Sequence, residues 1–133
     1  MTIESEFQSW NVTATEDLSA ASRRHKAVTI FGTISGTNAL TLGIMRSGNV
    51  SGGQVSVVVN GITKAVVATA ITTPGWPITV TGSGFVAPAT TAASGGTVGT
   101  GHIGRYLGTA AAASGDLIPV LVNFTQVSPW ANA

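Results

Sequence analysis

Short apolar segments separated by glycine-rich stretches fill the chain from Lys26 to Phe124. Within these segments apolar side chains recur at every second position, as at Val55, Val57 and Val59. A period of two is typical of β-strands that bury one face. The pattern predicts strands over residues 28–34, 40–45, 54–60, 62–69, 78–80, 85–87, 102–107 and 117–124.

Asn60 and Gly61 separate two of these segments. Both residue types accept the positive φ of a type I′ turn, and Asn-Gly between alternating segments is the strongest short-range signal for a β-hairpin. We therefore expect residues 54–60 and 62–69 to pair as an antiparallel hairpin.

The recurrence of strands about every eight to twelve residues, with glycine-rich turns between them, is typical of an all-β domain. We expect a small antiparallel β-sandwich or β-barrel with an extended N-terminal arm and a short C-terminal tail. The arm and a following turn occupy residues 1–24, the single β-rich domain residues 25–124, and the tail residues 125–133. Helix is expected only as a turn or two within residues 15–24.

Aromatic side chains occur in both terminal segments, with Phe7 and Trp10 in the arm and Trp130 in the tail. An aromatic residue in such a segment contributes binding energy when a partner surface buries it. We therefore expect these three residues to contact a partner. The alternative is that they fold back onto their own domain.

Charged residues make up only 8% of the chain, against about 25% in an ordinary globular domain. The net charge of +1 argues against nucleic acid as a partner, because a phosphate-binding face needs clustered Lys and Arg. The basic residues cluster only at Arg23, Arg24 and Lys26, around His25. We expect Arg23 and Arg24 to contact an acidic protein surface, and the alternatives are binding of phosphate and a solvated run of charge.

Gly99, Gly101 and Gly104 spell G-x-G-x-x-G, the pattern of a dinucleotide-binding loop. Such a loop follows a buried strand and begins a helix of a βαβ unit. Here a loop of small residues precedes the glycines, and a strand pattern follows them. We therefore predict that this region is a strand that pairs with the last one, and that no cofactor is bound.

The candidates for acid–base chemistry are few. Neither His25 nor His102 has a second His, Asp or Glu at the spacing of metal ligands, and the chain has no cysteine. Asp116 follows Gly115 and is expected to be a turn residue whose carboxylate accepts hydrogen bonds from local backbone amides. We predict no catalytic residues, no metal site and no enzymatic activity.

The N-terminal sequence MTIESEFQSW lacks the basic and apolar regions of a signal peptide. Glycine, threonine and proline interrupt every apolar stretch well short of the ~20 residues that a membrane helix needs. We therefore expect synthesis in the cytoplasm and no membrane partner.

Three stretches follow one another in a recognisable order: VTATEDLSAASRRHKAVTIFGTI, LTLGIMRSGNVSGGQVSVVVNGITKAVVATAIT and HIGRYLGTAAAASGDLIPVLVNF. Their order and spacing resemble the capsid decoration (cement) proteins of tailed bacteriophages. The first is similar to that family's arm, E-D-L-S-A turn and K-A-V strand. The second is similar to its central strands, and the third to its last two strands and the alanine-rich loop between them. The resemblance covers residues 11–124.

This resemblance implies a structural virion protein on the outer surface of a phage capsid, where it bridges subunits of the major capsid protein. It also implies self-association as a dimer or trimer. Two alternatives remain, namely another virion β-domain of a minor capsid, tail or fibre protein, and a small module that binds a carbohydrate or a host surface.

Overall fold

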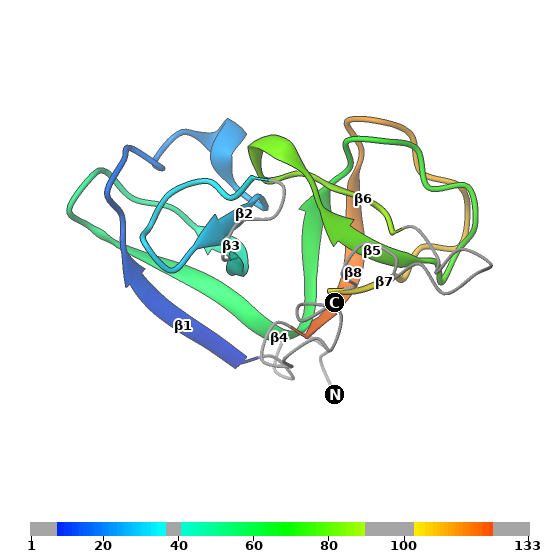
Figure 1. The fold of residues 1–133 in the computed structure, drawn as a ribbon, viewed down its shortest axis with the longest axis horizontal. Coiled ribbons are helices and arrows are strands. Elements are labelled where there is room, and N and C mark those ends of the chain that lie inside the picture. The colour runs from blue at the N-terminus through cyan, green and yellow to red at the C-terminus, as the bar shows by residue number, and fades with distance from the viewer. Residues whose placement is uncertain (1–7, 37–40, 90–102, 124–133) are drawn as a thin grey trace, which may run out of the picture.

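The computed structural model describes residues 8–36, 41–89 and 103–123, and it shows an all-β protein, as predicted (Figure 1). The strands are β1 (Gln8–Thr13), β2 (Ala27–Thr29), β3 (Thr41–Ser47), β4 (Gln54–Val66), β5 (Pro77–Val80), β6 (Val86–Pro88), β7 (Gly104–Tyr106) and β8 (Leu117–Asn123). The helical elements among the described residues are two short 3-10 helices, η2 (Ala21–Arg23) and η3 (Gly82–Gly84).

One sheet contains all eight strands in the order β2-β3-β4-β8-β7-β5-β6, and β1 pairs with β4 beside this path. All pairs of named strands are antiparallel. The sheet curls until the end of β4 meets β6, where Val67 forms a bridge with Val86 and the Ala68 N–H donates to the Val86 carbonyl at 2.8 Å. Of the two architectures predicted, the structure is therefore the barrel, and it is nearly closed.

The hairpin predicted at Asn60 and Gly61 is wrong. β4 continues through both residues as one strand of 13 residues, and Figure 1 shows it as a long ribbon that bends sharply. Before the bend β4 lies between β1 and β3, and after the bend it pairs with β8. Gly61 has a φ of +119°, which a side chain would disfavour, so the glycine permits a bend rather than a reversal of the chain.

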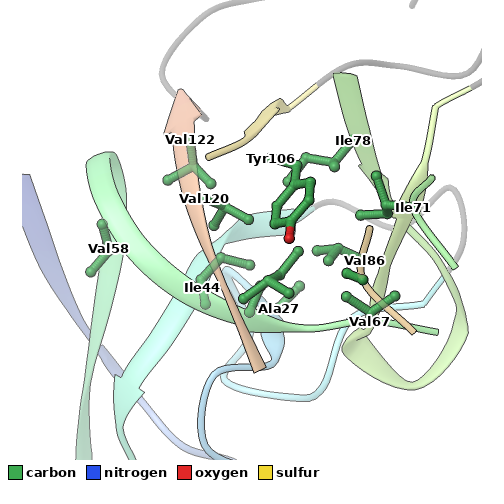
Figure 2. Close-up of a cluster of buried hydrophobic side chains, with 13 residues drawn as sticks. Ala27, Ile44, Val58, Val67, Ile71, Ile78, Val86, Tyr106, Val120 and Val122 are labelled. Carbon is green, nitrogen blue, oxygen red and sulfur yellow. The ribbon is translucent and has the colours of Figure 1, made fainter. Parts of the chain in front are cut away.

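Residues of β2, β3 and the first half of β4 bury side chains on both faces of the sheet. Ile44 and Val58 point into the barrel, where they join Ile78, Tyr106 and Val120 in the cluster that Figure 2 shows. The residues next to Ile44 and Val58 in the chain point the other way and form a second cluster, which contains Leu18, Val28, Met45, Val55 and Val57. Because successive side chains of a strand point to opposite faces, alternate residues of these strands pack into two different cores.

The predicted N-terminal arm is corrected by the structure for residues 8–24. β1 pairs along β4 from Gln8 to Thr13, and Ala14 and Leu18 are 1% and 0% exposed. These apolar residues cover the face of β4 that carries Val57, and burial of that face stabilises the fold. The segment belongs to the domain, and its helical content is limited to η2.

The other predicted strands correspond to observed ones. β5, β6, β7 and β8 lie within or close to the predicted ranges, although residues 102 and 124 fall outside the described part of the chain. The strand predicted over residues 28–34 is shorter, because β2 ends at Thr29 and the Gly32 N–H then donates back to the Thr29 carbonyl at 3.1 Å.

Candidate interaction surface

The outer face of the barrel over β4, β8 and β7 is unusually apolar. Along β8, buried and exposed positions alternate, so Ile118, Val120 and Val122 fill the barrel while the residues between them face solvent. The strand registers place these outward residues beside outward residues of β4 and β7. We call this surface the β8 face and define it by Ile62, Lys64, Val66, Arg105, Leu107, Leu117, Pro119 and Leu121.

Three leucines of the β8 face are well exposed. Leu117 is 50% exposed, Leu121 42% and Leu107 40%. Leu121 pairs with Ile62 on one side and with Arg105 on the other, so the side chains form a continuous row across three strands. An outer sheet face normally carries polar residues, and a contiguous apolar one marks an interaction surface.

A shallow pocket of about 220 Å³ adjoins the β8 face. Arg105, Leu121 and Asn123 line it from β7 and β8, and Pro77 lines it from β5. The Arg105 guanidinium donates to the Gly75 carbonyl at 3.1 Å, which holds the side chain over this region. A partner side chain in the pocket would contact both an apolar wall and a cation.

The β8 face is not among the contacts that the sequence predicts. The sequence does contain a sign of an apolar outer face, because residues 117–122 are apolar at every position. A strand with one buried face needs apolar residues only at alternate positions. The period of two cannot show which of the two alternating sets of residues in such a run faces solvent. The register with β4 and β7 decides that.

Trp10, predicted as a partner contact, lies on β1 and is 64% exposed. It pairs with Val57 of β4, and most of its indole is accessible. Its role as a partner contact stays a prediction. Phe7 and Trp130, the other two predicted aromatic contacts, lie outside the described residues.

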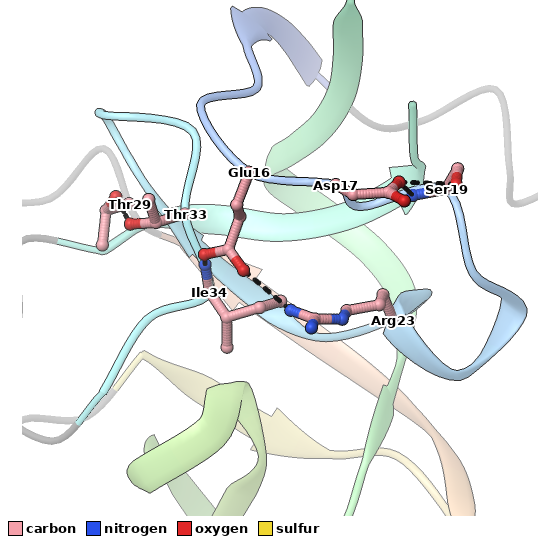
Figure 3. Close-up of polar contacts among 7 residues, drawn as sticks. All are labelled: Glu16, Asp17, Ser19, Arg23, Thr29, Thr33 and Ile34. Atoms are coloured by element: carbon pink, nitrogen blue, oxygen red, sulfur yellow. Dashed lines mark hydrogen bonds and ion pairs between the residues drawn. The ribbon is translucent and has the colours of Figure 1, made fainter. Parts of the chain in front are cut away.

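Arg23 and Arg24 differ in their surroundings. Arg23 forms an ion pair with Glu16 at 2.8 Å, and the other carboxylate oxygen of Glu16 accepts the Ile34 N–H at 3.1 Å (Figure 3). Glu16 therefore ties η2 to the chain after β2. Arg23 takes part in this link, and its role as a partner contact stays a prediction. Arg24 is exposed and stays a predicted partner contact.

Asp17 makes a separate local contact just before η2. Its carboxylate accepts hydrogen bonds from the Ser19 hydroxyl at 2.6 Å and the Ser19 N–H at 3.0 Å (Figure 3). These hydrogen bonds lower the pKa of Asp17, because they stabilise its charged form. The carboxylate is thus engaged locally.

His25 occupies an unusual position between Arg24 and the start of β2. Its φ is +63°, and its Nδ1 atom is shielded from solvent with no hydrogen-bond partner among the described residues. Burial lowers the pKa of His25, and the positive charges of Lys64 and Arg24 lower it further. The imidazole is therefore held in its neutral form, and both cations lie within electrostatic range of it.

We expect His25 to make the fold less stable in mild acid. Its folded-state pKa lies below the ordinary value near 6.5, so the unfolded chain takes up the proton first as the pH falls. Stability is thus highest above pH 6.5 and declines as the pH falls toward the folded-state pKa. The melting temperature should fall less between pH 7.5 and 5.5 in His25→Asn, because Asn tolerates the positive φ and does not titrate. An equal fall in melting temperature over this pH range in the variant and the original protein would contradict this expectation.

The glycine motif and Asp116 have structural roles where the structure describes them. Gly104 begins β7, which pairs with β8, as predicted, while Gly99 and Gly101 lie outside the described residues. The Asp116 carboxylate accepts the Ala113 N–H at 2.8 Å, which confirms the predicted turn. Within residues 8–36, 41–89 and 103–123 there is no group of three or more His, Asp or Glu residues that could hold a metal ion, and no helix able to cross a membrane.

Comparison with known proteins finds a likeness in fold. No protein-family model matches the sequence, and no curated protein does. Among solved structures, the fold is similar to the crystal structure of the head fiber gp8.5 N base in bacteriophage phi29. The TM-score is 0.57 at 12% sequence identity, over 92% of this chain and 98% of that one. The likeness is therefore one of fold over nearly the full length of both chains.

Proposed function

We propose that this chain is a structural protein of a tailed-bacteriophage virion that binds the outer surface of the capsid and bridges subunits of the major capsid protein. The observation that carries the proposal is the fold shared with the head fiber gp8.5 N base of phage phi29 over nearly the whole chain. The ordered resemblance of residues 11–124 to decoration proteins supports the same setting independently of the fold.

In this role the protein acts by adding buried area between capsid subunits. Many copies bind one shell, so each interface can be modest while the shell gains stability from all of them together. The role needs no catalytic residue and no cofactor, and it suits a chain in which only 8% of residues are charged. A dimer or trimer on the capsid is part of the proposal.

A second candidate function is the base of a head fibre, which the likeness to the phi29 protein favours. In both roles the domain attaches to the capsid exterior. They differ in what the domain does there, because a decoration protein bridges capsid subunits whereas a fibre base anchors a part that projects from the shell.

The test is binding of the purified full chain to phage heads that lack it. We expect the protein to co-sediment with these heads at a saturable stoichiometry and to raise the temperature at which they release DNA. Heads that already carry the protein are the matched control and should bind little more. Electron microscopy of the saturated heads distinguishes copies that bridge neighbouring capsid subunits, as proposed, from copies that do not. Failure to co-sediment at micromolar concentration would contradict the proposal.

A further inference from the structure

The β8 face combines exposed apolar side chains with positive charge, and its strands carry no acidic residue. Lys64 pairs with Pro119 and Arg105 with Leu121, and both cations are exposed. The strand residues of β4, β7 and β8 include no Asp or Glu.

A second copy of this face is a poor occupant. A two-fold contact of the face with itself would bring Lys64 and Arg105 of both copies together, and like charges at an interface repel. The β8 face of another copy offers no compensation, because none of the described acidic residues belongs to it, and Glu16 is already paired with Arg23 of its own chain. The complementary surface therefore belongs to a different protein.

We infer that the β8 face docks onto a surface of another virion protein that presents carboxylates around apolar side chains. This inference rests on the proposed function, and it names the surface used. The leucines of β8 form the centre of the contact, and Lys64 and Arg105 lie on either side of them. The adjoining pocket beside Arg105 and Leu121 would receive one partner side chain at the edge of the contact.

The inference is tested by comparing two double variants for binding to phage heads that lack the protein. Leu117→Asn with Leu121→Asn makes the β8 face polar, and Ile30→Asn with Val50→Asn is the matched control. The control residues are 50% and 54% exposed and lie on turns away from the β8 face, so both pairs remove apolar side chains of similar exposure. We expect the first variant to bind about tenfold more weakly or worse, and the control to bind like the original protein.

Charge variants supply a test that does not disturb the apolar residues. Lys64→Gln with Arg105→Gln should reduce the dependence of head binding on salt, because the screened charge pairs are lost. Lys26→Gln is the control for loss of a cation, since Lys26 lies over the Phe85 ring instead of on the β8 face.

Three results would overturn the inference. One is undiminished binding of the leucine variant together with an unchanged salt dependence of the charge variant. Another is a change in the molar mass of the free protein on the leucine substitutions, which would identify the face as a contact between copies. Failure of the original protein to bind heads would overturn the proposed function as well, whereas either of the other two results leaves it intact.

Discussion

Replacement of Gly104 with alanine is expected to lower the free energy of unfolding by about 3 kcal/mol. A Cβ atom at this position would lie 1.8 Å from the carbonyl oxygen of Leu121 and 2.9 Å from the Cα atom of Val122. Both are backbone atoms of β8, so they cannot rotate away as a side chain would. β7 and β8 would have to separate, and the Tyr106 side chain would leave the barrel core. Urea unfolding followed by circular dichroism measures the loss.

Gly82→Ala is the matched control for this experiment. A Cβ atom at Gly82 meets nothing within 4 Å, and the position does not require a positive φ. Its free energy of unfolding should stay within about 0.5 kcal/mol of the original value. If Gly104→Ala were equally stable, β7 could not pair with β8 in the register described, and the β8 face would lose Arg105 and Leu107.

Substitution of Leu18 with alanine is expected to cost about 3 kcal/mol of stability. Leu18 is 0% exposed and packs in the second core with Met45 and Val57. Its backbone is also fixed, because the Leu18 N–H donates to the Asn49 carbonyl at 2.8 Å. The substitution removes buried methyl groups and leaves a cavity that this anchored segment cannot close. The same urea titration measures the effect.

Val50→Ala is the control for Leu18→Ala. Val50 is 54% exposed on the turn before β4, so its truncation should change the free energy of unfolding by about 0.5 kcal/mol or less. An equally small effect of Leu18→Ala would mean that residues 14–24 are not packed on the sheet. That result would restore the arm that the sequence predicts.

Part of the fold follows from local pattern alone. The alternation at Val55, Val57 and Val59 predicts a strand with a buried face, and all three residues are buried in β4. Asp116 is predicted as a turn residue by its type and its position after Gly115, and its carboxylate makes the expected hydrogen bond. These features depend on residues within a few positions of one another, so the sequence specifies them directly.

Other features depend on contacts between distant parts of the chain. Asn60 and Gly61 carry a strong turn signal, yet Asn60 pairs with both Gln8 and Asn123, and these two partners keep β4 extended. Leu18 follows two acidic residues and looks like part of an arm, but Met45 and Val57 provide a face for it to cover. Long-range strand pairing outweighed the local preference at Asn60, and long-range burial did so at Leu18, since tertiary context routinely overrides such preferences.

The candidate surface, too, has features that the sequence predicts and features that only distant contacts determine. The sequence by itself determined that the chain is all-β and that charge is scarce, because residue type and period fix both. The sequence predicted an apolar strand at residues 117–122 but did not show which of its residues face solvent. Only the tertiary structure decided which of these residues face solvent and brought Lys64 and Arg105 beside them. The physical reason is that strand registers join residues far apart in the chain, and a surface exists only after the barrel has curled.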